Sequence, residues 1–121
     1  MIETEGLTHG QLIVRDVRRS LAFYEAVFGM EVRFWEGRRM VFIGTPGRRD
    51  TITLHQSEDI GRAGMAGGVD HIGFRLVDRS RLDEAIAAVT SAGGQVVECG
   101  EHGPGHRFAY VTDPDGYVIE L

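Results

Sequence analysis

Residues 113–121 have the sequence Asp-Pro-Asp-Gly-Tyr-Val-Ile-Glu-Leu, which predicts a turn followed by a short apolar strand. The Asp, Pro and Gly residues at its start are typical of turns. Side chains alternate along a strand, so Val118 and Glu120 share one face while Ile119 and Leu121 take the other. A carboxylate in so apolar a strand is costly to bury alone. We therefore expect the carboxylate of Glu120 to have a polar or charged partner.

The bulk composition predicts one soluble domain. The chain has 121 residues, of which 42% are hydrophobic and 26% are charged, enough for a substantial core. A net charge of −5 argues against a nucleic-acid surface, and all 13 basic residues are Arg, which excludes lysine Schiff-base chemistry. Cys99 is the single cysteine, and no apolar run approaches the roughly 20 residues of a membrane span. We expect a cytoplasmic protein that binds neither nucleic acid nor membrane.

The order of predicted elements indicates two copies of one half-domain. Each copy has a strand, a helix and three further strands. In the first copy the strands are expected at 7–15, 30–36, 39–45 and 51–56, and in the second at 69–77, 95–99, 107–112 and 118–121. A helix is expected after Asp16, with Gly29 at its end, and another between Ser80 and Gly93. The glycine-rich stretch 57–68 separates the copies.

Aligning the two copies brings four positions to the axis between them. His9 aligns with His71, and Thr53 aligns with Glu120. Three of these four are good metal ligands, and two imidazoles with one carboxylate leave open positions of the kind found in non-haem Fe(II) oxygenases. His55 shares a face with Thr53 and offers either a fourth ligand or an acid–base group. A fuller set of protein ligands would suit Zn or Ni acting as a Lewis acid.

The same residues belong to a set of motifs spread over almost the whole chain: His9, Val14-Arg15-Asp16, residues 20–24, Phe28-Gly29-Met30, residues 69–74, Gly93-Gly94 and residues 113–121. With these motifs the chain resembles the vicinal oxygen chelate superfamily, which includes glyoxalase I, extradiol dioxygenases, methylmalonyl-CoA epimerase, and the fosfomycin and bleomycin resistance proteins. The resemblance implies a single α+β domain over 1–121. Two βαβββ modules, about 5–57 and 68–121, would form a curved mixed eight-stranded sheet around a metal, usually in a homodimer. It also implies His9, His71 and Glu120 as the metal ligands.

Within that superfamily the residues favour an enzyme of the dioxygenase branch. The glyoxalase I and epimerase branches carry Glu or Gln where this chain has Thr53, whereas the dioxygenase branch uses two His and one Glu. Its C-terminal signature is approached by His106, Tyr110 and Glu120. We expect Fe(II), with Mn(II) as an alternative, and a catechol-like or polyphenolic substrate bound through vicinal oxygens. Tyr110, with His106 or His55, would steer protons and hydrogen-bond those oxygens.

Two other functions remain open from the sequence. One is a glyoxalase I-like isomerase or lyase that uses Zn or Ni. The other is a drug-binding protein of the bleomycin-resistance type without catalysis, although such proteins generally lack the three ligands that this chain keeps. The glycine-rich loop with His102 and His106 predicts either a solvated loop or a substrate contact by one of the two imidazoles.

Overall fold

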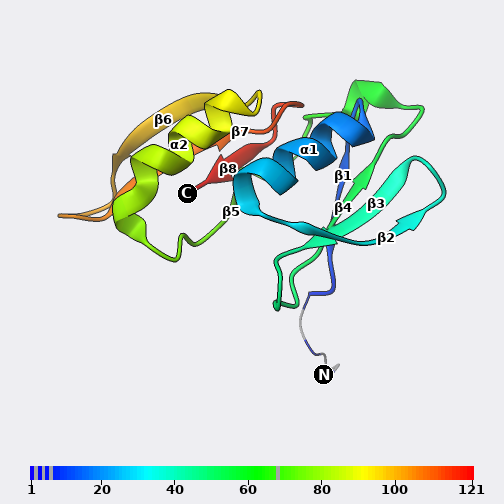
Figure 1. The fold of residues 1–121 in the computed structure, drawn as a ribbon, viewed down its shortest axis with the longest axis horizontal. Coiled ribbons are helices and arrows are strands. Elements are labelled where there is room, and N and C mark those ends of the chain that lie inside the picture. The colour runs from blue at the N-terminus through cyan, green and yellow to red at the C-terminus, as the bar shows by residue number, and fades with distance from the viewer. Residues whose placement is uncertain (2, 4, 6, 68) are drawn as a thin grey trace.

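Two four-stranded sheets and two α-helices make up the chain in the computed structural model, which describes residues 1, 3, 5, 7–67 and 69–121 (Figure 1). The first sheet has the strand order β1-β4-β3-β2 and the second has the order β5-β8-β7-β6. The elements are β1 (Gly10–Ile13), α1 (Val17–Phe28), β2 (Glu31–Glu36), β3 (Met40–Gly44), β4 (Ile52–His55), β5 (Ile72–Gly73), α2 (Leu82–Ser91), β6 (Gln95–Glu101), β7 (Arg107–Thr112) and β8 (Val118–Glu120). The predicted α+β class with repeated βαβββ order is confirmed, and hydrogen bonding divides the eight strands into two sheets.

Helix α1 begins and ends at the residues that the sequence predicted. Asp16 is extended, and its side chain accepts hydrogen bonds from the backbone N–H groups of Arg18 and Arg19. Gly29 closes the helix in the left-handed conformation with φ of 61°, which favours glycine. The helix packs on β3 and β4, and α2 packs on β6 and β7. Both helices also contact each other, so they cover one face of the paired sheets (Figure 1).

The second half departs from the predicted elements in three places. Strand β5 has two residues instead of the nine predicted at 69–77, and β6 extends to Glu101 instead of ending at residue 99. Helix α2 begins at Leu82 instead of directly after Ser80. Asp78 accepts the Ser80 N–H at the start of a short 3-10 helix (Arg79–Arg81), while Asp83 pairs with Arg107. The predicted module boundary at residue 68 lies outside the described residues.

The register of the strands confirms the alignment of the two halves. Strand β1 pairs in parallel with β4 so that Gln11 faces Thr53, and β5 pairs in parallel with β8 so that Gly73 faces Glu120. Ile119 is fully buried in the core beneath the helices, so its neighbour Glu120 points to the opposite, helix-free face of the second sheet.

The turn before β8 is built around Asp113. Its Oδ1 atom accepts the backbone N–H groups of Asp115, Gly116 and Tyr117 at 2.9–3.0 Å, and its Oδ2 accepts the hydroxyl of Tyr24 at 3.0 Å. An Asp side chain that caps its own turn in this way fixes the direction in which the chain leaves it. The turn therefore sets the path of the strand that carries Glu120.

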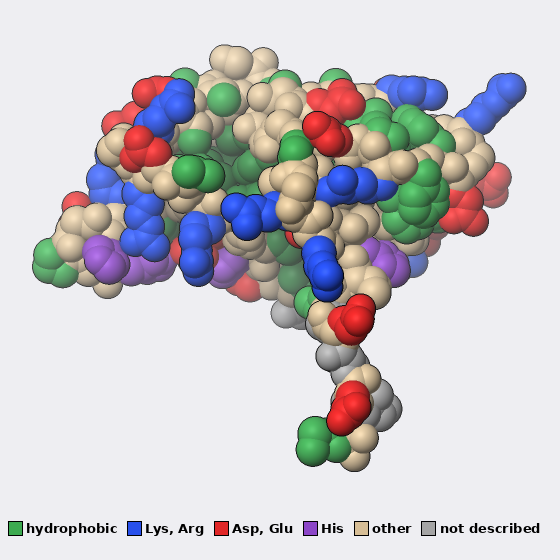
Figure 2. Space-filling view, turned by 60° about the horizontal axis from the view of Figure 1, so that its bottom comes forward, with side chains coloured by type: hydrophobic (Ala, Val, Ile, Leu, Met, Phe, Trp, Pro, Cys, Tyr) green, Lys and Arg blue, Asp and Glu red, His purple; other side chains and the backbone are tan. Residues whose placement is uncertain are grey.

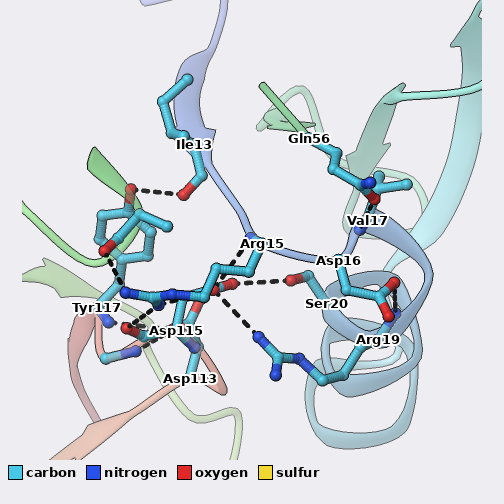
Figure 3. A network of polar contacts seen from close by, with 12 residues as sticks. Ile13, Arg15, Asp16, Val17, Arg19, Ser20, Gln56, Asp113, Asp115 and Tyr117 are labelled. Atoms are coloured by element: carbon cyan, nitrogen blue, oxygen red, sulfur yellow. Dashed lines mark hydrogen bonds and ion pairs between the residues drawn. The ribbon is translucent and has the colours of Figure 1, made fainter. Parts of the chain in front are cut away.

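A buried carboxylate joins this turn to the first half of the chain (Figure 3). Asp115 accepts hydrogen bonds from the backbone N–H and the guanidinium of Arg15, from the guanidinium of Arg19 and from the hydroxyl of Ser20, all at 3.1 Å. The side chain of Asp115 is completely buried, whereas the two Arg side chains are about half exposed. We call these four residues the polar joint. It ties the start of α1 to the strand that carries Glu120.

Aromatic packing adds a second link between the halves. The ring of Phe28, at the end of α1, stacks on Phe74, just after β5, with centroids 4.1 Å apart.

Within the described residues, neither α1 nor α2 is long and apolar enough to cross a membrane.

Candidate metal centre

The second sheet brings two of the predicted metal ligands together on its helix-free face. Glu120 lies on β8 between Gly73 of β5 and Tyr110 of β7. His71 immediately precedes β5, and its Nε2 atom lies 3.0 Å from Oε2 of Glu120. The side chains of His71 and Glu120 are 29% and 27% exposed, so a ligand can reach both.

Both ring nitrogens of His71 face carboxylates. Nδ1 lies 2.7 Å from Asp70, and Nε2 faces Glu120. A carboxylate accepts but does not donate, so Nδ1 carries a hydrogen toward Asp70, and Nε2 needs either a proton or a cation beside Glu120. The hydrogen bond to Asp70 raises the pKa of His71, and the charge of Glu120 adds to the rise. Proteins commonly orient a metal-binding His through such a carboxylate on its far nitrogen.

A second imidazole holds the other oxygen of Glu120. His102 follows β6, and its Nε2 lies 2.8 Å from Oε1 of Glu120. This hydrogen bond, followed by the charge of His71, lowers the pKa of Glu120. Glu120 is therefore ionised at neutral pH, as a metal-ligating carboxylate must be.

Aromatic rings line the sheet beside this carboxylate. The ring centroids of His71 and Tyr110 are 5.0 Å apart, those of Tyr110 and Phe108 are 5.2 Å apart, and His102 stacks on Phe108 at 4.0 Å. Burial raises the pKa of the Tyr110 phenol, and the charge of Glu120 adds to the rise. Tyr110 therefore keeps its hydroxyl proton and offers a hydrogen-bond donor beside His71.

A cavity of about 400 Å³ opens next to Glu120 and His102. His106, Arg75 and Arg79 also line it. Among the described residues, neither of these two Arg side chains takes part in a salt bridge. Figure 2 shows Arg and His side chains gathered at the end of the molecule where β6 and β7 lie. The cavity is large enough for a small molecule, and its charge favours one that carries an anionic group.

The remaining predicted site residues lie on the first sheet. His9 precedes β1 and its ring lies 6.1 Å from that of Phe42, while His55 ends β4. In the described part of the chain, no contact joins His9 to His71, and no three His, Cys, Asp or Glu side chains are arranged to hold a metal. One chain thus brings together two of the three predicted ligands, His71 and Glu120, and the trio with His9 stays a prediction.

Thr53 occupies the position on β4 that matches Glu120 on β8. It is fully buried, and its hydroxyl has no hydrogen-bond partner within the described residues. A hydroxyl is a weak metal ligand, and a buried one is not exposed to an incoming ion. The first sheet therefore supplies no carboxylate where the second sheet supplies one.

Sequence reasoning left His102 without a definite role. The alternation of β6 contains the missing signal, because Glu98 faces Tyr110 and Gly100 faces Phe108 across the β6–β7 pair. Two residues further along, His102 continues the same face. Extending the predicted strand from Cys99 to Glu101 would have placed this imidazole beside Glu120.

Comparisons with known proteins agree with the fold. A model of the Glyoxalase/Bleomycin resistance protein/Dioxygenase superfamily matches residues 6–121, and the chain belongs to this superfamily. It is 34% identical over 126 positions to a lactoylglutathione lyase of Neisseria meningitidis serogroup A, covering 95% of this chain and 88% of the relative. A lactoylglutathione lyase of Salmonella typhimurium is 32% identical, with 95% and 90% covered.

The solved structures support the fold. The fosfomycin resistance protein FosX of Listeria monocytogenes superposes with a TM-score of 0.79 at 22% identity, covering 98% of this chain and 93% of its own. Membership of the superfamily implies a divalent metal and a small-molecule substrate. The curated relatives favour the glyoxalase-type alternative over the Fe(II) dioxygenase that the sequence analysis put first.

Proposed function

We propose that the chain is a metal-dependent enzyme of the glyoxalase type, which isomerises the hemithioacetal of methylglyoxal and glutathione to a thioester. The observation that carries the proposal is the contact of His71 Nε2 with Glu120 Oε2 at 3.0 Å, beside a cavity lined by Arg75 and Arg79. Relatives named lactoylglutathione lyase support the same reaction class.

The donor set fits a divalent cation. An imidazole nitrogen and a carboxylate oxygen are both donors that would hold Zn or Ni, and His71 Nε2 lies 3.0 Å from Glu120 Oε2. The hydrogen bond of His71 to Asp70 leaves Nε2 directed at Glu120. When bound, Zn or Ni would supply Lewis-acid polarisation of a substrate oxygen.

The residues around His71 and Glu120 would have separate roles in catalysis. Tyr110 keeps its proton and donates a hydrogen bond to a substrate oxygen. Arg75 and Arg79 bind the carboxylates of the glutathione portion in the cavity. His106 lines the same cavity and would take and return a proton during isomerisation. His55 lies on the first sheet, so its contribution requires the two sheets of different copies to meet.

A homodimer would complete the site with His9 of a second copy. This part of the proposal rests on the lack of a contact between His9 and His71 among the described residues of one chain, because the first sheet then carries one of the three predicted ligands and the second sheet carries the other two. Mixing equal amounts of His9→Ala and Glu120→Ala variants tests it. Random exchange would restore about a quarter of the activity, since half of the dimers would hold one intact site. Ligands drawn from a single chain would restore none.

The Fe(II) dioxygenase is the second candidate, and the buried Thr53 favours it by leaving a metal with fewer protein ligands. The two reactions separate cleanly in one experiment. Protein loaded with Zn, Ni or Fe(II) is assayed for thioester formation from methylglyoxal and glutathione, and for oxygen uptake on a catechol panel. Thioester formation with Zn or Ni supports our proposal. Oxygen uptake with Fe(II) and no thioester would replace it, and tight binding of an aromatic drug without turnover would favour a bleomycin-resistance-type module.

A further inference from the structure

His102 is positioned by two contacts of its imidazole and by the hydrogen bonds of its backbone. Its ring stacks on Phe108 with centroids 4.0 Å apart and an interplanar angle of 13°. Its backbone N–H donates to the carbonyl of His106 at 3.0 Å, and the His106 N–H donates to the carbonyl of Gly103 at 2.9 Å, so the hairpin tip is closed. Its Nε2 then contacts Glu120 at 2.8 Å. The glycine-rich tip thus delivers a fixed side chain to the site.

Strand β6 leaves room for the stacking of His102 on Phe108. Gly100 faces Phe108 across the β6–β7 pair, and a Cβ at Gly100 would lie 3.0 Å from two atoms of the Phe108 ring. The absence of a side chain lets that ring lie close against β6. Phe108 is in turn only 9% exposed, so the surface on which His102 stacks is itself packed.

The two oxygens of Glu120 have different partners. Oε2 faces Nε2 of His71 at 3.0 Å, whereas Oε1 accepts from Nε2 of His102 at 2.8 Å. A carboxylate on a metal can rotate between binding through one oxygen and through both. A donor fixed on the outer oxygen removes that freedom and directs the inner oxygen at the ion.

This chain has particular need of such a constraint. Thr53 stands where the first sheet would otherwise supply a second carboxylate, and its buried hydroxyl cannot take that place. The affinity for a cation therefore depends more heavily on how well the single carboxylate of Glu120 is oriented.

We propose that His102 is a positioning residue that holds Oε1 of Glu120, so that Glu120 binds the metal through Oε2 alone. The inference rests on the proposed metal centre of His71 and Glu120. It assigns to the hairpin tip a role in metal affinity rather than a role in contacting substrate only.

Metal titration of the full chain tests the inference without reference to turnover. Wild type, His102→Ala and His102→Gln are titrated with Co(II), following the visible absorption of the bound ion, and with Zn(II) against a chelating dye. We expect His102→Ala to weaken binding about 10- to 100-fold, as loss of such an outer partner does. His102→Gln should stay within about 3-fold of wild type, because the Gln amide places an N–H near the position of the imidazole Nε2. The Co(II) spectrum should change in His102→Ala and be restored in His102→Gln.

His106→Ala is the matched control, since it removes an imidazole from the same loop that has no contact with Glu120 among the described residues. It should bind metal as wild type does. Because His102 is 57% exposed, the variants should fold, and thermal melts check this. Equal metal affinity and Co(II) spectra for wild type and His102→Ala would overturn the inference alone. Failure of folded wild type to bind either metal would overturn the proposed function and this inference together.

Discussion

The polar joint makes a quantitative prediction about stability. Asp115→Ala removes a fully buried carboxylate that accepts from Arg15, Arg19 and Ser20. The two guanidinium contacts count for little, together about 1 kcal/mol, because those side chains are 46% and 47% exposed. The buried hydroxyl of Ser20 and the partly buried backbone N–H of Arg15 are different, since each loses its acceptor at a cost of about 1–2 kcal/mol. The sum is a loss of about 3–5 kcal/mol.

Melting and denaturant curves measure this loss. For a chain of 121 residues the entropy of unfolding near the midpoint is about 0.25 kcal/mol/K, so the expected fall in Tm is roughly 12–20 °C. Circular dichroism during thermal and urea unfolding gives Tm and the free energy of unfolding. Because the joint also sets the path of β8, the folded Asp115→Ala protein should bind Zn(II) more weakly than wild type.

Asp83→Ala is the control for this prediction. Its carboxylate pairs with Arg107 at 2.7 Å, but the two side chains are 74% and 48% exposed. Its removal should shift Tm by only a small fraction of the change at Asp115. If both variants melt alike, the buried acceptors do not hold the halves together, and the reasoning about the joint is wrong.

Three further outcomes follow from other parts of the structure. Thr53→Val replaces a buried hydroxyl that lacks a hydrogen-bond partner among the described residues with a methyl group. The free energy of unfolding should therefore stay within about 1 kcal/mol of wild type or rise. A loss above about 2 kcal/mol would show that the hydroxyl of Thr53 makes a stabilising hydrogen bond. Tyr24 has a pKa raised by burial and by Asp113, so its contribution to stability is complete below pH 10 and is lost as pH rises through the folded pKa. Above pH 10 the free energy of unfolding of wild type should therefore fall faster than that of Tyr24→Phe, by about 1.4 kcal/mol per pH unit. Urea unfolding midpoints that change equally with pH in the two proteins from pH 9 to 11 would contradict this. Zn(II) at about 100 times its Kd should stabilise wild type by about 2.7 kcal/mol and should not stabilise His71→Ala, which differential scanning fluorimetry with and without EDTA can check.

Several features could be predicted because local rules govern them. The Asp-Pro-Asp-Gly turn forms through hydrogen bonds between residues two to four apart, and helix α1 begins at Asp16 and ends at Gly29 through its own caps. The alternation of β8 placed Glu120 and Ile119 on opposite faces, as the burial of Ile119 confirms. Each of these signals is complete within a few consecutive residues.

Other features depend on residues far apart in the chain. Strand β5 pairs with β8 only over Ile72 and Gly73, which is much less than the apolar run of its own sequence predicts. The contact of His102 with Glu120 spans 18 residues and exists because β7 pairs with β8 in the sheet, which brings the tip of the β6–β7 hairpin close to Glu120. The alternation of β6 shows the face on which His102 lies, but the length of the strand depends on its pairing with β7.

The amino-acid sequence alone was enough to predict the repeated βαβββ order, the turn before β8 and the equivalence of His9 with His71 in the two copies, since periodicity, caps and turn residues act within short stretches. Which of these side chains meet in one chain depends on the three-dimensional fold. It joined His71, Glu120 and His102 on the second sheet and left His9 on the first, because the polar joint and the helix contacts fix the two sheets relative to each other through interactions between distant residues.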